Sequence, residues 1–174
     1  LDVISRAHFL LGDGRGNLSA QVSSGASFTH TLSLADFDND GKLDAIDKMD
    51  ATCMRYAWGS GSGTFSSIGT LTGFTNSRAH AEGDFDGDGF TDVLVVAEPP
   101  PRAKEPAPAH AYVLYGGRGE LFRRYSECYS LGEDRVAQES LRPYYVGDYN
   151  GDGFLDVMTY NLFAFLGGPM GPME

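Results

Sequence analysis

Three short stretches of the sequence place acidic side chains at the same spacing: DFDNDGKLD at 36–44, DFDGDGFTD at 84–92 and DYNGDGFLD at 148–156. Aspartate or asparagine occupies positions 1, 3, 5 and 9 of each stretch, and glycine occupies position 6. Alternate residues of a tight turn direct their oxygens towards one point, where carboxylates repel one another unless a cation lies between them. Ca²⁺ accepts about six to eight oxygens, whereas Mg²⁺ keeps several waters. The spacing therefore predicts three calcium sites.

Each predicted site uses four side chains and the backbone carbonyl of position 7, where the side-chain type does not matter. Lys42, Phe90 and Phe154 are expected to contribute only that carbonyl. Asn150 carries no charge and should weaken the third site, because calcium affinity follows ligand charge. The expected ligands are Asp36, Asp38, Asp40, Lys42 and Asp44 in the first loop, Asp84, Asp86, Asp88, Phe90 and Asp92 in the second, and Asp148, Asn150, Asp152, Phe154 and Asp156 in the third.

Other kinds of site fit the sequence less well. A helical calcium hand requires glutamate at position 12, but Asp47, Val95 and Thr159 stand there. No GxSxG motif of a nucleophilic serine occurs, and metal binding already accounts for most of the clustered carboxylates. We therefore expect a protein that is not an enzyme.

The overall charge argues against polyanionic partners. The 174 residues include 13 Lys+Arg and 24 Asp+Glu, a formal net charge of -11. This charge repels a phosphate backbone and an anionic membrane surface. No apolar stretch reaches the about 18 residues of a membrane span. We expect neither a nucleic-acid partner nor membrane insertion.

The acidic loops belong to a longer repeat. A strand-like run precedes and follows each loop, and a third run ends at glycines. Each full unit reads as four antiparallel strands, the size of one propeller blade, so the predicted fold class is all-β. The aligned glycine-ended runs are HFLLGDG at 8–14, RYAWGSG at 55–61, AYVLYGG at 111–117 and LFAFLGG at 162–168.

The repeats divide a single repeat domain, 1–174, into four units. The first unit lacks its acidic loop, because LDVI at 1–4 matches LDAI at 43–46. The chain thus carries parts of about four blades, fewer than a whole ring. A fragment of a longer chain, a ring completed by several chains and an open stack of blades all stay open. The predicted units are a partial blade at 1–27, blades at 28–75 and 76–141, and a partial blade at 142–174.

The three loops, preceded by LA, EG or VG and followed by a strand, resemble the FG-GAP/VCBS repeats of integrin-α-like calcium-binding β-propellers and related secreted lectins. The resemblance covers nearly the whole chain. It implies an extracellular or cell-surface binding module that recognises carbohydrate or a glycoprotein surface, with further blades or self-assembly completing the ring. Two alternatives are a non-catalytic accessory domain of a secreted hydrolase or lyase and a structural repeat of a surface filament.

Two smaller features leave alternatives open. Cys53 and Cys128 are compatible with free thiols or with a disulfide. The tripeptide NLS at Asn17 matches a glycosylation sequon, a pattern that is common by chance.

Overall fold

The protein folds into small antiparallel sheets. A computed structural model describes residues 3–5, 8–10, 15–18, 22–23, 28, 32–50, 53–98, 110–118, 125–130, 143–159 and 164–169. Within these ranges the secondary structure is strand without helix, which confirms the all-β fold class. No helix of these ranges has the length and apolar character required to cross a membrane.

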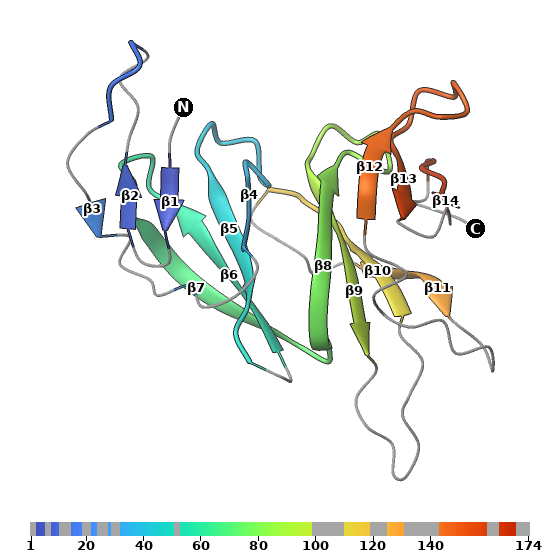
Figure 1. The fold of residues 1–174 in the computed structure, drawn as a ribbon, viewed down its shortest axis with the longest axis horizontal. Helices are drawn as coiled ribbons and strands as arrows, with labels where there is room; N and C mark the ends of the chain where they lie inside the picture. The colour runs from blue at the N-terminus through green and yellow to red at the C-terminus, as the bar shows by residue number, and fades with distance from the viewer. Residues whose placement is uncertain are drawn as a thin grey trace, which may run out of the picture.

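Four separate sheets follow one another along the chain (Figure 1), and in the described residues none closes on itself. Within each sheet, strands that follow one another in the sequence are hydrogen-bonded in antiparallel ladders. The sheets comprise β1 (Val3–Ser5), β2 (His8–Leu10) and β3 (Val22–Ser23); β4 (Leu32–Ala35), β5 (Asp44–Lys48), β6 (Cys53–Gly59) and β7 (Phe65–Thr72); β8 (Thr75–Gly83), β9 (Asp92–Glu98), β10 (His110–Leu114) and β11 (Tyr125–Ser130); and β12 (Pro143–Gly147), β13 (Asp156–Thr159) and β14 (Ala164–Phe165).

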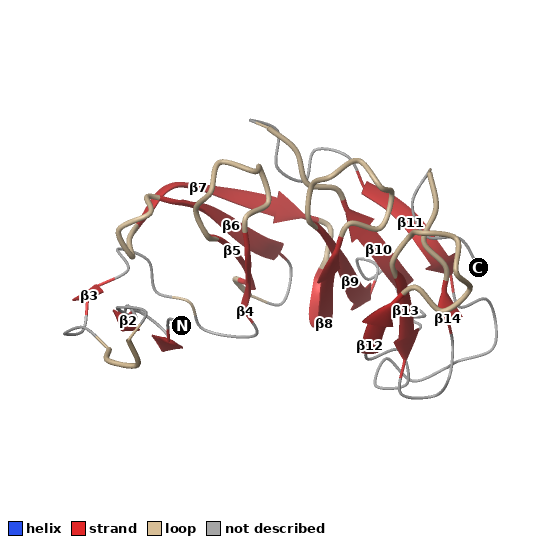
Figure 2. Ribbon diagram, turned by 90° about the horizontal axis from the view of Figure 1, so that it is seen from above, coloured by secondary structure: helices blue, strands red, loops and turns tan. Residues whose placement is uncertain are grey.

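The sheets fall in the four predicted ranges, except that β8 begins one residue before position 76. The identity of these ranges as blades stays a prediction. Figure 2 shows the sheets in an arc, with the first strand of each sheet on the inner side and β7 and β11 on the outer side. Strand β8 contacts β4, β5 and β6 on one side and β12 on the other. The second, third and fourth sheets are therefore packed against one another.

Much of the hydrophobic core lies between the second and third sheets and between the third and fourth. One buried cluster joins Phe37 and Ile46 of the second sheet to Val93 and Leu114 of the third. A second cluster joins Phe85 and other residues of the third sheet to residues of the fourth. Burial of this apolar area supplies the main force that holds the sheets together.

Aromatic residues of the third strands belong to this packing. Tyr56, Trp58 and Tyr112 pack against the cluster between the second and third sheets. Tyr115 is buried in the cluster between the third and fourth sheets. Their contacts match the inter-sheet packing that large rings commonly provide.

Two buried side chains, Cys53 and Asp47, lie on strands of the second sheet. Cys53 is buried and is not part of a disulfide, whereas the side chain of Cys128 lies outside the described residues. Asp47 is fully buried, and both of its oxygens accept hydrogen bonds from the Arg55 guanidinium, at 3.1 and 3.0 Å. The guanidinium also lies 5.2 Å from the centre of the Phe28 ring. Asp47 is thus a paired structural group on β5.

Candidate metal centre

The three acidic loops occupy equivalent places in three consecutive sheets. Each loop joins the first strand of its sheet to the second, and all three lie at the upper edge in Figure 1. The strands pair up to the loop itself, since Ala35 pairs with Asp44, Gly83 with Asp92, and Gly147 with Asp156. The position-9 aspartate is therefore the first residue of the second strand in every case.

The backbone turns in the same way in each loop. Positions 4 and 6 have positive φ angles, which glycine adopts readily and asparagine tolerates. In the first loop these are Asn39 at 57° and Gly41 at 84°. The other two loops have glycine at both positions: Gly87 at 77°, Gly89 at 88°, Gly151 at 78° and Gly153 at 92°. Glycine at position 6 is part of the predicted motif, whereas the requirement at position 4 emerges from the structure.

Side-chain oxygens of positions 1, 3 and 5 accept hydrogen bonds from the backbone of the same loop. In the first loop, Asp36 accepts from the N–H of Gly41 at 2.8 Å, and Asp38 accepts from the N–H of Asp40 at 3.1 Å. Asp40 accepts from the N–H of Lys42 at 2.9 Å. The same three bonds recur in the second and third loops. These bonds hold the carboxylates on the inside of the turn.

The position-9 aspartate connects its loop to the end of the third strand. In the second loop, Asp92 accepts hydrogen bonds from the N–H of Phe85 at 3.0 Å and from the N–H of Gly116 at 2.9 Å. The equivalent bonds recur in the other two loops. Asp44, Asp92 and Asp156 are 1%, 0% and 0% exposed. The structure thus gives this position a structural contact in addition to its predicted place among the metal ligands.

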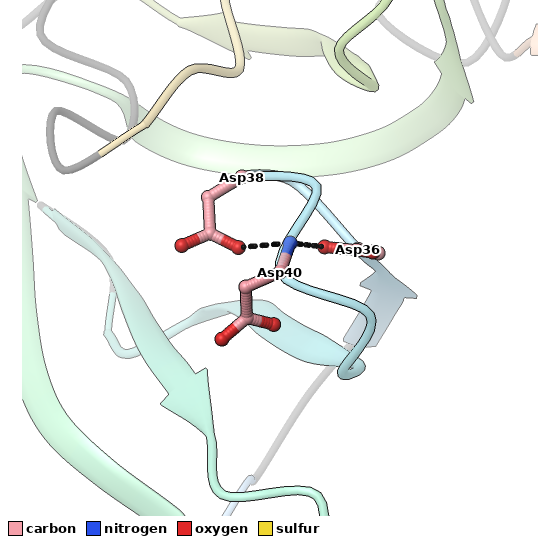
Figure 3. Close-up of side chains that lie close together, drawn as sticks. All are labelled: Asp36, Asp38 and Asp40. Atoms are coloured by element: carbon pink, nitrogen blue, oxygen red, sulfur yellow. Dashed lines mark hydrogen bonds between the residues drawn. The ribbon is translucent and has the colours of Figure 1, made fainter.

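Two loops bring three carboxylates close together. One oxygen each from Asp36, Asp38 and Asp40 lies within 4.8 Å of the others. Figure 3 shows these three side chains on the first loop, where the Asp40 N–H donates to Asp36 and Asp38. In the second loop Asp84, Asp86 and Asp92 meet the same criterion. Oxygen donors at such separations suit a hard divalent cation.

The remaining predicted ligands lie in the loops but outside these two groups. They include Asp44 in the first loop and Asp88 in the second. Within the described residues, the third loop has no such close group of three carboxylates. Asn150, an amide, stands at position 3 of this loop and donates its N–H to Asp152 at 2.9 Å. Asp148, Asp152 and Asp156 keep the hydrogen-bond pattern of the other loops.

Burial raises the affinity of the loops for protons when no cation is present. It raises the pKa of Asp44 from 3.8 to about 6 and that of Asp92 to about 7. Hydrogen bonds from backbone N–H groups oppose these shifts, and neighbouring carboxylates add to them. Burial also raises the pKa of Asp38. A divalent cation would favour the ionised forms and reverse these shifts.

Lys42 contributes its side chain to the first loop, in addition to the backbone carbonyl that the sequence predicts as a ligand. Its ammonium pairs with Asp40 at 2.5 Å, and this hydrogen bond lowers the pKa of Asp40. Both side chains are partly open to solvent. The second and third loops carry Phe90 and Phe154 at this position, so only the first loop has its own cation beside the carboxylates.

Contacts also join one loop to the next. The Asn39 side chain donates a hydrogen bond to the carbonyl of Gly89 in the second loop, at 2.6 Å. A Cβ atom at Gly87 would lie 2.5 Å from the Phe154 ring of the third loop, so the two loops approach closely there. Sequence spacing could not reveal these contacts, because they depend on how the sheets pack.

The predicted side chains therefore form three similar loops at one edge of the protein, two of which contain a close carboxylate group. No protein-family model, no curated protein and no solved structure matches the chain. The assignment of a function consequently rests on the loops and the sheets themselves.

Proposed function

We propose that the chain is a calcium-stabilised binding module of the β-propeller type, related to FG-GAP/VCBS repeats. The observation that carries this proposal is the triplicated loop: three consecutive sheets use the same residue positions, the same backbone turns and the same hydrogen bonds to arrange acidic side chains. Isolated Asp-Gly turns do not require such repetition.

The donor set favours calcium over other ions. Carboxylate, amide and carbonyl oxygens are hard ligands, and a loop with up to four anionic side chains suits a cation that accepts many oxygens. Ions in the first two loops would be held by the close carboxylate groups, and the third by Asp148, Asn150 and Asp152. The bound ions would reduce repulsion at the loop edge and hold the first and second strands of each sheet together.

The stabilising role has a direct test in thermal unfolding. A ligand that binds only the folded state adds about 2.7 kcal/mol per site when its concentration is 100 times the dissociation constant. We expect the melting temperature to rise in millimolar Ca²⁺ relative to chelator, and to rise less in Asp88→Ala. Glu82→Ala, an exposed acidic residue on β8, serves as the control and should retain the full increase. Equal melting temperatures with calcium and with chelator would contradict the proposal.

The ligand of the module is proposed from the resemblance alone: carbohydrate or a glycosylated protein at the cell surface, bound without catalysis. A glycan-array screen in calcium and again in chelator tests this part. A sugar that binds only in calcium would support a lectin. A blank array would instead favour protein adhesion or scaffold assembly.

A further inference from the structure

Neighbouring acidic loops touch each other at loop position 4. In the first loop, the Asn39 side chain donates a hydrogen bond to the carbonyl of Gly89 in the second loop, at 2.6 Å. In the second loop, Gly87 stands at position 4, and a Cβ atom added there would lie 2.5 Å from the Phe154 ring of the third loop. Position 4 of one loop therefore meets position 6 or 7 of the next loop at both interfaces.

The peptide unit that Asn39 contacts also holds expected metal ligands of the second loop. The N–H of Gly89 donates to Asp84 at 2.9 Å, and the N–H of Phe90 donates to Asp88 at 2.9 Å. The Gly89 carbonyl and the Phe90 N–H belong to one planar peptide unit, so they move together. The Asn39 side chain thus fixes, from the first loop, the N–H group that bonds to Asp88.

Asn39 is equally tied to the ligands of its own loop. It stands between Asp38 and Asp40, in the left-handed conformation that the turn requires, with a φ of 57°. The N–H of Asp40 donates to Asp36 at 3.0 Å and to Asp38 at 3.1 Å. An ion held by these carboxylates would fix the peptide unit that follows Asn39, and with it the position of the Asn39 amide.

A second connection between consecutive loops repeats at both interfaces. The carbonyl of Phe37, at position 2 of the first loop, accepts a hydrogen bond from the N–H of Gly117 at 3.0 Å. The preceding residue, Gly116, donates its N–H to Asp92 of the second loop at 2.9 Å. The bonds of the next interface, at 3.0 and 2.8 Å, join Gly168 to Phe85 and Gly167 to Asp156. Two adjacent glycines therefore link each loop to the position-9 aspartate of the next one.

We propose that calcium binding by consecutive loops is positively coupled, and that the bond from Asn39 to Gly89 carries coupling between the first and second loops. This inference rests on the proposed calcium sites and concerns their regulation. A loop that a filled neighbour already holds in place loses less conformational freedom when it binds its own ion. By thermodynamic linkage, an ion in the second loop must raise the affinity of the first by the same factor.

Charge alone would give coupling of the opposite sign. A bound cation lowers the attraction of the neighbouring carboxylates for a second cation, and salt screens this effect beyond about 8 Å at physiological ionic strength. A gain in affinity when the neighbouring loop is filled, measured at that ionic strength, would therefore be due to the contacts between the loops.

A calcium titration followed by two-dimensional amide NMR measures each loop separately. The N–H of the position-6 glycine bonds to the position-1 aspartate in every loop, so its signal responds to an ion in that loop. Gly41 reports the first loop and Gly89 the second. Unchanged signals of both glycines in calcium would overturn the proposed calcium sites together with the coupling. Signals that respond, with affinities that do not depend on the neighbouring loop, would overturn the coupling alone.

The coupling is measured by weakening one loop and titrating the other. Asp36→Asn combined with Asp38→Asn removes two charges, and the asparagine oxygens can still accept the loop hydrogen bonds, as Asn150 does in the third loop. We expect the calcium affinity at Gly89 to fall by about fivefold or more in this variant. The reciprocal variant, Asp84→Asn combined with Asp86→Asn, should lower the affinity at Gly41 by the same factor.

Asn39→Gly tests the contact itself. Glycine stands at this position in the other two loops, with φ angles of 77° and 78°, so the turn is retained. We expect the coupling factor between the first and second loops to fall towards one. The control is Gly151→Asn, which adds the same side chain to the third loop, where no atom of another described segment lies within 4 Å of the Cβ position. This control should keep the full factor. An unchanged factor in Asn39→Gly, or an equal loss in both variants, would overturn the proposal.

Discussion

At the scale of single residues, the position-9 aspartates combine a predicted metal-ligand position with a structural contact. Asp92 is fully buried, and its two oxygens accept from the N–H groups of Phe85 and Gly116. Asp92→Ala would leave both donors without this partner, which costs about 1–3 kcal/mol for each buried donor. We therefore expect a clear loss of unfolding free energy even in chelator, measured by urea denaturation.

A matched substitution separates this structural role from metal binding. Asp88 is exposed, and its oxygen accepts a single bond within the loop, from the N–H of Phe90. Asp88→Ala should change the stability in chelator by less than about 1 kcal/mol, as is usual for exposed sites. Equal losses of unfolding free energy for the two variants in chelator would mean that the two hydrogen bonds of Asp92 stabilise the fold no more than the single bond of Asp88.

The raised pKa values of Asp44 and Asp92 make calcium binding dependent on pH. The folded-state values of about 6 and about 7 exceed the ordinary 3.8, so the metal-free folded chain keeps protons that the unfolded chain loses as the pH rises above about 4. Without metal, the contribution of these groups to stability therefore falls with rising pH, until the pH exceeds the folded-state pKa values. Calcium must displace the same protons, so its binding weakens as the pH falls below about 7.

Calorimetric calcium titration measures this effect. If Asp92 must ionise for the second loop to bind, its affinity should be roughly 30-fold lower at pH 5.5 than at pH 8, from a pKa of about 7. Asp92→Asn should bind more weakly at pH 8 and lose much of the pH dependence. An affinity that is the same at both pH values would show that Asp92 does not limit binding.

The local part of the candidate site is accessible from the sequence, because the expected ligands of each loop lie within nine positions of one another, and the structure brings three carboxylates together in two of the loops. The structural contacts of position 9 are harder to predict, since Asp44 and Asp92 bond to backbone N–H groups 15 and 24 residues away. The bond from Asn39 to Gly89 spans 50 residues and crosses from one sheet to the next. Such contacts depend on sheet packing, which residue spacing does not specify.

At the scale of elements, a glycine stands at or just after the end of the third strand because position 8 of the acidic loop passes directly over it. A Cβ atom at Gly167 would lie 2.3 Å from the carbonyl oxygen of Leu155, a backbone atom that cannot move away easily. Gly116 meets Thr91 in the same way, at 2.4 Å. The glycine-ended runs that align in the sequence thus have a steric cause.

Adjacent glycines provide a matched test of this steric requirement. Gly167→Ala should destabilise the protein by about 1–3 kcal/mol or more, as overpacking does. Gly168→Ala should be tolerated, because no atom lies within 4 Å of its Cβ position and its N–H still bonds to Phe85. Urea denaturation of both variants gives the comparison. Similar losses at both positions would contradict the proposed clash.

At the scale of the whole molecule, the order of the sheets decides which copy of a repeated position is buried. The sequence predicts short strands and acidic loops in the correct order because each unit contains its own turn and strand signals. It does not predict that Phe37 and Phe85 are buried while Tyr149 is exposed, since all three are aromatic and occupy the same loop position. The difference arises because the following sheet packs over Phe37 and Phe85. An aromatic residue at the same loop position therefore contributes differently to stability in different sheets.

This difference gives a prediction for two substitutions at one repeat position. Phe37→Ala removes a fully buried ring between the second and third sheets and should cost about 3–5 kcal/mol of unfolding free energy. Tyr149→Ala should cost less than about 1 kcal/mol, because its ring is 47% exposed. Urea denaturation measures both. A large loss for Tyr149→Ala would mean that its ring stabilises the fourth sheet as Phe37 stabilises the second, and the exposure of the ring would then not decide its contribution.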